Sequence, residues 1–149
     1  MKTGGVKDLL RSGGYSLVIE NHGMRTFSGR GVKDLLRLLE EEPQVLNGAK
    51  IADKVVGKAA AALMVLGKAS EVYAELISTP AVALLRKYGV AVSFGNETDH
   101  IMNRDETGWC PMETACRNVD SPTDMLRAIK EKMAEMMNGK KTDNNINRQ

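Results

Sequence analysis

The sequence is poor in the residues that build disulfide frameworks and metal centres. Its 149 residues include only two cysteines, Cys110 and Cys116, and two histidines, His22 and His100. Two thiols cannot form a disulfide framework or a four-cysteine zinc site, and the histidines are predicted to lie in a turn and a loop. Phosphate-binding and dinucleotide-binding glycine motifs are missing as well. The sequence therefore predicts no metal and no other cofactor.

Long apolar runs and a strong excess of one charge are also absent. The longest apolar run, residues 59–66, is too short to cross a bilayer, which takes about 20 residues. Residues 1–10 lack the apolar stretch of a secretory signal. The 21 basic and 19 acidic side chains leave a net charge of +2, without basic stripes interleaved with aromatics. We therefore expect a cytoplasmic protein that uses neither a membrane nor long nucleic acid as a partner.

The apolar content is sufficient for one domain, although only six residues are aromatic. A 149-residue chain with 42% apolar residues can bury a core without disulfides, filled here by aliphatic side chains and nine methionines. The final stretch, residues 139–149, is almost entirely polar, which predicts a disordered tail. The sequence thus predicts a single domain over residues 1–138, followed by that tail.

An exact heptapeptide, Gly-Val-Lys-Asp-Leu-Leu-Arg, occurs twice, at residues 5–11 and 31–37. Apolar residues at i, i+3 and i+4 predict a short amphipathic helix for each copy. We expect the two helices to dock alike on one sheet; the alternative is a partner surface common to both copies. Between them, residues 15–20 and 24–28 flank a turn-forming Asn-His-Gly and predict a β-hairpin.

Helices and strands alternate along the rest of the chain. The expected elements are an extended piece at 49–52, a helix at 54–66 stopped by Gly67, a strand at 71–78, a helix capped by Thr79 and ended by Gly89, a short buried strand at 90–94, a polar loop at 95–109, a helix from Pro111 and a last helix capped by Ser121. This order predicts an α/β protein, a three-layer α/β/α sandwich with a mixed sheet that begins with the hairpin.

The first candidate site residues lie at the predicted start of the helix at 54–66. Lys54 and Lys58 would lie one turn apart near the positive end of the helix dipole, where they repel each other. Gly57 inside a helix costs about 1 kcal/mol relative to alanine, which suggests that something approaches the backbone closely. A bound anion would account for these features. The alternative is that Asp53 only caps the helix while the lysines point into water.

The second candidate start is the segment Cys110-Pro111-Met112-Glu113. With Pro111 as the first helical residue, Cys110 falls at the cap, where the helix dipole favours a thiolate and hence a nucleophile. Glu113 could transfer a proton beside that thiol. In the alternative interpretation, Glu113 reaches back to the cap N–H and serves only the helix.

Four segments, residues 13–18, 31–33, 52–61 and 110–113, together resemble the domain of unknown function 1893 family. The resemblance covers residues 6–115 and implies a fold similar to that of the cytidine deaminases, with a pocket where the two helix starts meet. Zinc deaminases carry H-x-E or C-x-E at the first start and P-C-x-x-C at the second. Here the first start has no histidine or cysteine, and Glu113 stands where the second cysteine would be expected. The resemblance therefore implies a relative of the deaminases without zinc.

These observations lead to three functional hypotheses. The first is a metal-independent enzyme for a small anionic or nucleotide-like molecule, in which Asp53 orients the substrate or acts as base, Lys54 or Lys58 holds the anion, Cys110 attacks and Glu113 moves a proton. The second is a non-catalytic metabolite- or nucleotide-binding module. The third is an assembly protein, a homo-oligomer joined through the duplicated helices or through the methionine-rich last helix.

Overall fold

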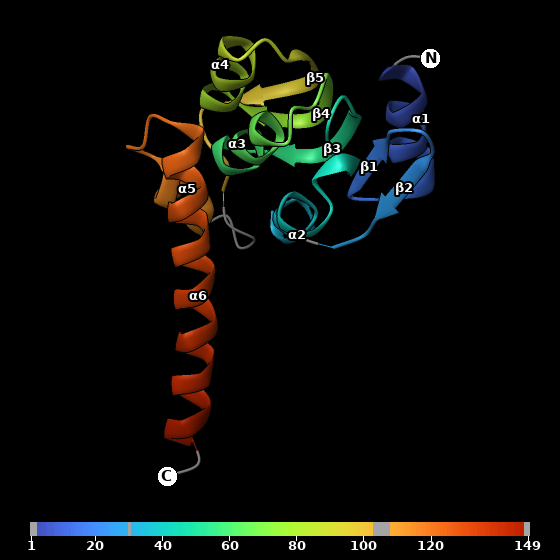
Figure 1. The fold of residues 1–149 in the computed structure, drawn as a ribbon. Coiled ribbons are helices and arrows are strands. Elements are labelled where there is room, and N and C mark those ends of the chain that lie inside the picture. Colours follow the sequence, from blue (N-terminus) through green and yellow to red (C-terminus); the bar gives the residue numbers. More distant parts are fainter. Residues whose placement is uncertain (1–2, 30, 103–107, 148–149) are drawn as a thin grey trace.

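The protein is built around one five-stranded mixed sheet (Figure 1). The computed structural model describes residues 3–29, 31–102 and 108–147. The strands are β1 (Leu17–Glu20), β2 (Met24–Phe27), β3 (Lys50–Val56), β4 (Glu71–Ser78) and β5 (Ala91–Thr98), in the order β2-β1-β3-β4-β5. β1 runs antiparallel to β2 and β3, whereas β3, β4 and β5 are parallel. The predicted mixed sheet of the α/β class, beginning with a β-hairpin, is confirmed.

Helices lie on both faces of this sheet (Figure 1). α1 (Thr3–Gly13) packs on one face, against β1, β3 and β4, and is the only described helix there. The other elements gather on the opposite side: α2 (Lys33–Glu41), the short 3-10 helix η1 (Pro43–Val45), α3 (Lys58–Leu66), α4 (Thr79–Lys87), α5 (Pro111–Cys116) and α6 (Pro122–Asn147). α3 is central on that side, because it contacts α2, α4, α5 and α6. Its run of four alanines is buried and allows these neighbours to approach closely.

The two copies of the duplicated heptapeptide form helices on opposite faces of the sheet. Val6 and Leu10 of α1 pack with Val18, Ala52 and Tyr73 in a small core of their own. The second copy contributes to the larger core, where its apolar residues meet the face covered by α3 and α4. The prediction of two amphipathic helices is confirmed, but the expectation that they dock alike is wrong. Local periodicity specifies an apolar stripe and leaves open which sheet face covers it.

The largest difference from the sequence prediction lies at residues 53–57. The predicted helix from Lys54 is wrong in its first turn, because β3 continues to Val56 and α3 begins at Lys58. Val55 and Val56 pair in register with Leu76 and Ile77 of β4. The β-branched pair is suited to a strand, and the parallel ladder with β4 therefore extends past Lys54, where the helix was predicted to begin.

The last strand and the last helix also extend beyond their expected limits. The strand expected at 90–94 is present as β5, but it continues to Thr98 and is an edge strand with partly exposed side chains, so its expected length and burial are wrong. Of the loop expected at 95–109, residues 103–107 lie outside the described residues. α6 begins where predicted, with the Asp124 N–H donating to Ser121 Oγ at 3.1 Å. It runs to Asn147, into the polar segment expected to be a disordered tail. Figure 1 shows α6 projecting away from the sheet. Among the described residues, no helix is long and apolar enough to span a membrane.

Candidate functional site

The turn from β3 into α3 is the first part of the candidate site. Gly57 is the N-cap residue of α3, with an extended backbone, rather than a residue inside the helix as predicted. Lys58 is the first residue of the helix. A helix start carries unpaired N–H groups and a partial positive charge, which together attract a negative group.

The negative group at this helix start is the chain's own Glu113. This α5 side chain is only 4% exposed. Its Oε2 accepts a hydrogen bond from the Ala59 N–H at 3.4 Å, and its carboxylate lies against Gly57 so closely that a Cβ there would come within 2.5 Å of Cδ. The sequence indicated a close approach to Gly57, and the structure shows one. The bound anion expected at this helix start stays a prediction. The approaching group comes from within the chain, 56 residues further on.

Burial dominates the electrostatics of Glu113. Loss of hydration raises its pKa above the ordinary value, while the N–H groups of Ala59 and Lys58, the Ser78 hydroxyl and the Lys58 charge oppose that rise. Ser78 is itself fully buried and caps α4, because its Oγ accepts from the Ala81 N–H at 3.3 Å. The starts of α3 and α4, which follow two neighbouring parallel strands, thus meet at one buried carboxyl group.

Lys58 connects the start of α3 with the end of α5. Its side chain is half-buried, and its Nζ donates to the Arg117 carbonyl oxygen at 3.4 Å. Its charge also acts on Glu113 and on Cys116. Lys58 therefore contacts the end of α5 and brings a positive charge close to the Glu113 carboxylate.

The two thiols differ in their surroundings. Cys110 is the N-cap residue of α5, as predicted, and is half-buried. Cys116 is fully buried, and burial followed by the nearby Glu113 charge raises the pKa of its thiol to about 11. Cys116 is therefore a protonated core residue at neutral pH, and Cys110 is the thiol that a solvent molecule can reach.

Asp53 and Lys54 lie in β3 and do not share the start of α3. Asp53 pairs in register with Leu17 and Ala74, and its Oδ1 accepts from the Val55 N–H at 3.3 Å. Burial raises the pKa of Asp53 to about 7, opposed by the N–H groups of Val55 and Lys54. The predicted capping role of Asp53 is wrong, because Gly57 is the cap.

Lys54 lies beside α1, away from the start of α3. It lines a cavity of about 430 Å³ together with residues of α1, the turn after it, β3 and β4: Leu10, Arg11, Gly14, Val55 and Glu75. The predicted pair of lysines on one helix face is therefore wrong. A strand separates residues four apart by about 13 Å along its axis, whereas a helix stacks them on one face.

A stack of three side chains beside Cys110 was not found from the sequence. The Trp109 ring lies parallel to that of His100, with 4.4 Å between centroids and 9° between planes. The Arg117 guanidinium lies 4.4 Å from the same indole ring. The only signal in the sequence was that the single tryptophan directly precedes Cys110. The stack thus joins the residue before Cys110 to Arg117, whose carbonyl oxygen accepts from Lys58.

Comparison with known proteins decides the family. The model of the family described as TM1506, domain of unknown function (DUF1893), matches residues 5–133. The chain belongs to the DUF1893 family. The crystal structure of the DUF1893 protein TM1506 from Thermotoga maritima is similar to it, with a TM-score of 0.76 and 26% identity over 84% of this chain and 85% of that chain. No curated protein matches the chain.

The family match extends over both helix starts. In this DUF1893 chain, Gly57, Lys58 and Glu113 are brought together, and Cys110 stands three residues before Glu113 at the start of α5. Asp53 and Lys54 are set apart in β3. Across the described ranges 3–29, 31–102 and 108–147, no cluster of three or more His, Cys, Asp or Glu side chains is arranged to hold a metal ion.

The two thiols of this DUF1893 chain should react at very different rates. We expect iodoacetamide to alkylate Cys110 in the folded protein, while buried Cys116 reacts only in denaturant. They should not form a disulfide, since six helical residues span about 9 Å and a disulfide needs Cα atoms within about 7 Å. Peptide mapping by mass spectrometry checks this. Equal labelling of both thiols in the native protein would contradict the burial of Cys116.

Proposed function

We propose that this DUF1893 chain has a cytidine-deaminase-like arrangement and acts, without a metal, on a small anionic or nucleotide-like molecule bound where α3 and α5 begin. The proposal rests on one observation, the buried Glu113 carboxylate seated on the start of α3 beside Lys58. Buried acids with a raised pKa next to a specific charge are concentrated at functional sites. The location also fits, because ligands of α/β sheets bind outside the carboxyl ends of parallel strands.

The proposed likeness to deaminases concerns the position of the site at two helix starts and not the metal chemistry. In the zinc enzymes, two helix starts supply the metal ligands and a glutamate that moves protons. In this chain the corresponding starts supply Gly57, Lys58, Cys110 and Glu113, so a carboxylate occupies the space between the helices. These side chains do not fit a zinc site, since one thiol and one carboxylate leave too few ligands.

Each proposed role follows from exposure and charge. Lys58, half-buried with its charge at the helix start, holds the anionic group of the ligand. Cys110 is the reachable thiol and supplies the nucleophile. Glu113 holds a proton more readily than a free glutamate does, because it is buried, and exchanges that proton with the reacting groups. Asp53 does not belong to this site, because its carboxyl group is held by the backbone of β3.

A thermal-shift screen of nucleoside monophosphates and sugar phosphates tests the binding step. A ligand at 100 times its dissociation constant should stabilise the protein by about 2.7 kcal/mol. Lys58→Met should abolish the ligand-induced shift, whereas Lys54→Met should retain it, since Lys54 lines a different cavity beside α1. The shift is compared within each variant, so a change in basal stability does not affect the result. Retention of the full shift in Lys58→Met would remove the anion-binding role.

A non-catalytic binding module is the second candidate, and the burial of Glu113 favours it. A carboxyl group that is 4% exposed and lies against Gly57 is out of reach of a ligand unless α5 moves. Incubation of the wild-type chain with each bound molecule, followed by mass spectrometry, separates the two functions. Turnover that is lost in Cys110→Ser while the thermal shift persists supports the enzyme. Recovery of every bound molecule unchanged supports the binding module.

A further inference from the structure

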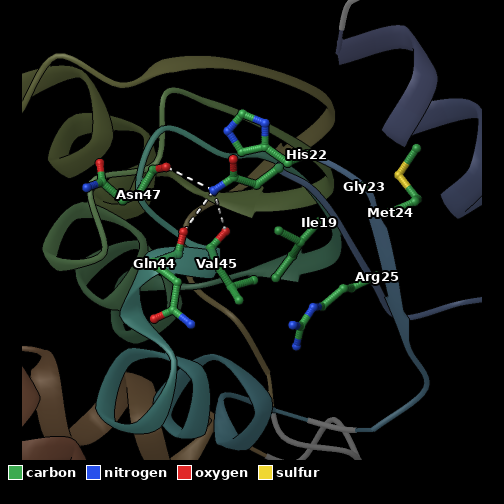
Figure 2. Close-up of a pocket in the computed structure, with 9 residues that line it drawn as sticks. Ile19, His22, Gly23, Met24, Arg25, Gln44, Val45 and Asn47 are labelled. Atoms are coloured by element: carbon green, nitrogen blue, oxygen red, sulfur yellow. Dashed lines mark hydrogen bonds between the residues drawn. The ribbon is translucent and has the colours of Figure 1, made fainter.

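A second cavity, distinct from the one beside α1, lies at the end of the sheet where β3 begins, between the hairpin turn and η1 (Figure 2). Its volume is about 580 Å³, within the range of small-molecule sites. Asn21 follows the end of β1 and Asn47 precedes β3, so both lie where β3 begins, whereas Gly57 follows its end. The lining residues are Ile19, Asn21, His22, Gly23, Met24, Arg25, Gln44, Val45 and Asn47.

The side-chain amide of Asn21 links the two chain segments that form the walls of this cavity. Asn21 Nδ2 donates to the carbonyl oxygens of Gln44 at 2.9 Å, Val45 at 3.1 Å and Asn47 at 3.0 Å (Figure 2). These bonds tie the hairpin turn to a segment more than 20 residues away. A cavity with fixed walls loses little conformational entropy when a ligand binds, which favours affinity.

The hairpin turn holds a histidine at the cavity in an uncommon conformation. His22 has a φ of 57°, in the left-handed region, and its side chain is exposed. Gly23 follows with a φ of 146°, which glycine tolerates best. Left-handed non-glycine residues are uncommon, although histidine is among the enriched types. The turn thus places a side chain with two ring nitrogens at the rim, and a glycine there would remove the ring without backbone strain.

Among the residues that line this cavity, Arg25 carries a permanent charge. Arg25 contacts Glu42 at 3.2 Å and Arg37 contacts the same carboxylate at 3.3 Å. Arg25 therefore shares its carboxylate partner with a second guanidinium group. An added carboxylate or phosphate oxygen would complete the pairing of Arg25, and guanidinium groups suit both oxyanions.

We infer that this cavity binds a small molecule carrying one carboxylate or phosphate group, with its acid group on Arg25 and its body between the amides and the apolar floor. Ile19 and Val45 form that floor, and both are buried. The Gln44 and Asn47 side chains at the rim supply hydrogen-bond donors and acceptors. This site is separate from the one at the starts of α3 and α5, and its occupancy does not depend on the proposed enzyme.

An NMR titration of the ¹⁵N-labelled full chain tests this site. Inorganic phosphate, acetate and uridine monophosphate are each titrated at constant ionic strength. We expect saturable shifts of the His22, Gly23, Gln44 and Asn47 amides. Phosphate binding without acetate binding would assign a phosphate ligand, and the reverse would assign a carboxylate. Tighter binding of the nucleotide than of phosphate would show that the body of the ligand contributes.

Matched variants make the test specific. Arg25→Met should weaken binding at least 10-fold. Arg11→Met is the control, because Arg11 also pairs with one glutamate at 3.3 Å but lies in α1, away from this cavity, and it should leave binding unchanged. His22→Gly, which suits the left-handed backbone, should fold normally and weaken binding about 3-fold. Absence of saturable shifts at these amides, or equal binding in wild type, Arg25→Met and His22→Gly, would overturn the inference.

Discussion

Replacement of Gly57 by alanine should destabilise the protein by roughly 1 to 3 kcal/mol, the range typical of overpacking a core. The new Cβ would lie 2.5 Å from Glu113 Cδ and 3.0 Å from Oε1, so the carboxyl group must leave the start of α3. That displacement also breaks the hydrogen bond from the Ala59 N–H. Urea-induced unfolding, followed by circular dichroism, measures the loss as a lower midpoint without a change in slope.

A double-mutant cycle identifies Glu113 as the cause. Glu113→Ala removes the obstructing side chain, so Gly57→Ala should cost much less in that background, and the coupling free energy should exceed about 1 kcal/mol. Gly5→Ala is the matched control. Gly5 lies in the first turn of α1, as Gly57 lies at the start of α3, but a Cβ at Gly5 meets nothing within 4 Å. That variant should be stabilised by about 0.5 to 1 kcal/mol. Additive effects of Gly57→Ala and Glu113→Ala would show that the two residues do not meet.

Asp53→Asn should stabilise the protein at pH 8.5 and have little effect at pH 4. Burial raises the pKa of Asp53 from 3.8 to about 7, so the folded chain keeps this proton over a range in which the unfolded chain has lost it. Stability therefore falls as pH rises from about 4 to 7 and the full loss remains above that range. Asparagine carries no charge and can still accept from the Val55 N–H through Oδ1.

The gain in Asp53→Asn should be about 1 to 3 kcal/mol at pH 8.5. Each unit of pKa shift corresponds to about 1.4 kcal/mol, and the half-buried position of the side chain reduces the full value. Denaturant unfolding at the two pH values measures it, with Asp120→Asn, an exposed aspartate, as control. A gain that is the same at pH 4 and pH 8.5 would be inconsistent with a buried titrating carboxyl group at position 53.

Local signals in the sequence were sufficient for much of the fold. The turn at Asn21-His22-Gly23 predicted the hairpin, alternation predicted β4 within its observed bounds, and the cap residues Cys110 and Ser121 placed the starts of α5 and α6. Each of these depends on residues within one or two turns of each other. The boundary at Lys54 was wrong because pairing of Val55 and Val56 with β4 is a tertiary interaction that the periodicity of the chain does not contain.

The candidate site was predicted only in part, because it too depends on contacts between residues far apart in the sequence. Gly57 was recognised as a place of close approach, and Glu113 as a carboxylate near a helix start, but their contact joins residues 56 positions apart. Lys54 was assigned to the site only through the misplaced helix start. The cavity at Asn21 and Arg25 was not predicted, because it depends on how the hairpin turn meets η1.

We propose that the starts of α3 and α5 form one small-molecule site arranged around Glu113. The most direct measurement is an NMR titration of the ¹⁵N-labelled chain, in the presence of a chelator, with the nucleoside monophosphate or sugar phosphate that gives the largest thermal shift. We predict that the amides of Lys58, Ala59, Cys110 and Glu113 shift together with a single dissociation constant. Shifts confined to one helix start, or found only at the hairpin turn, would contradict the claim.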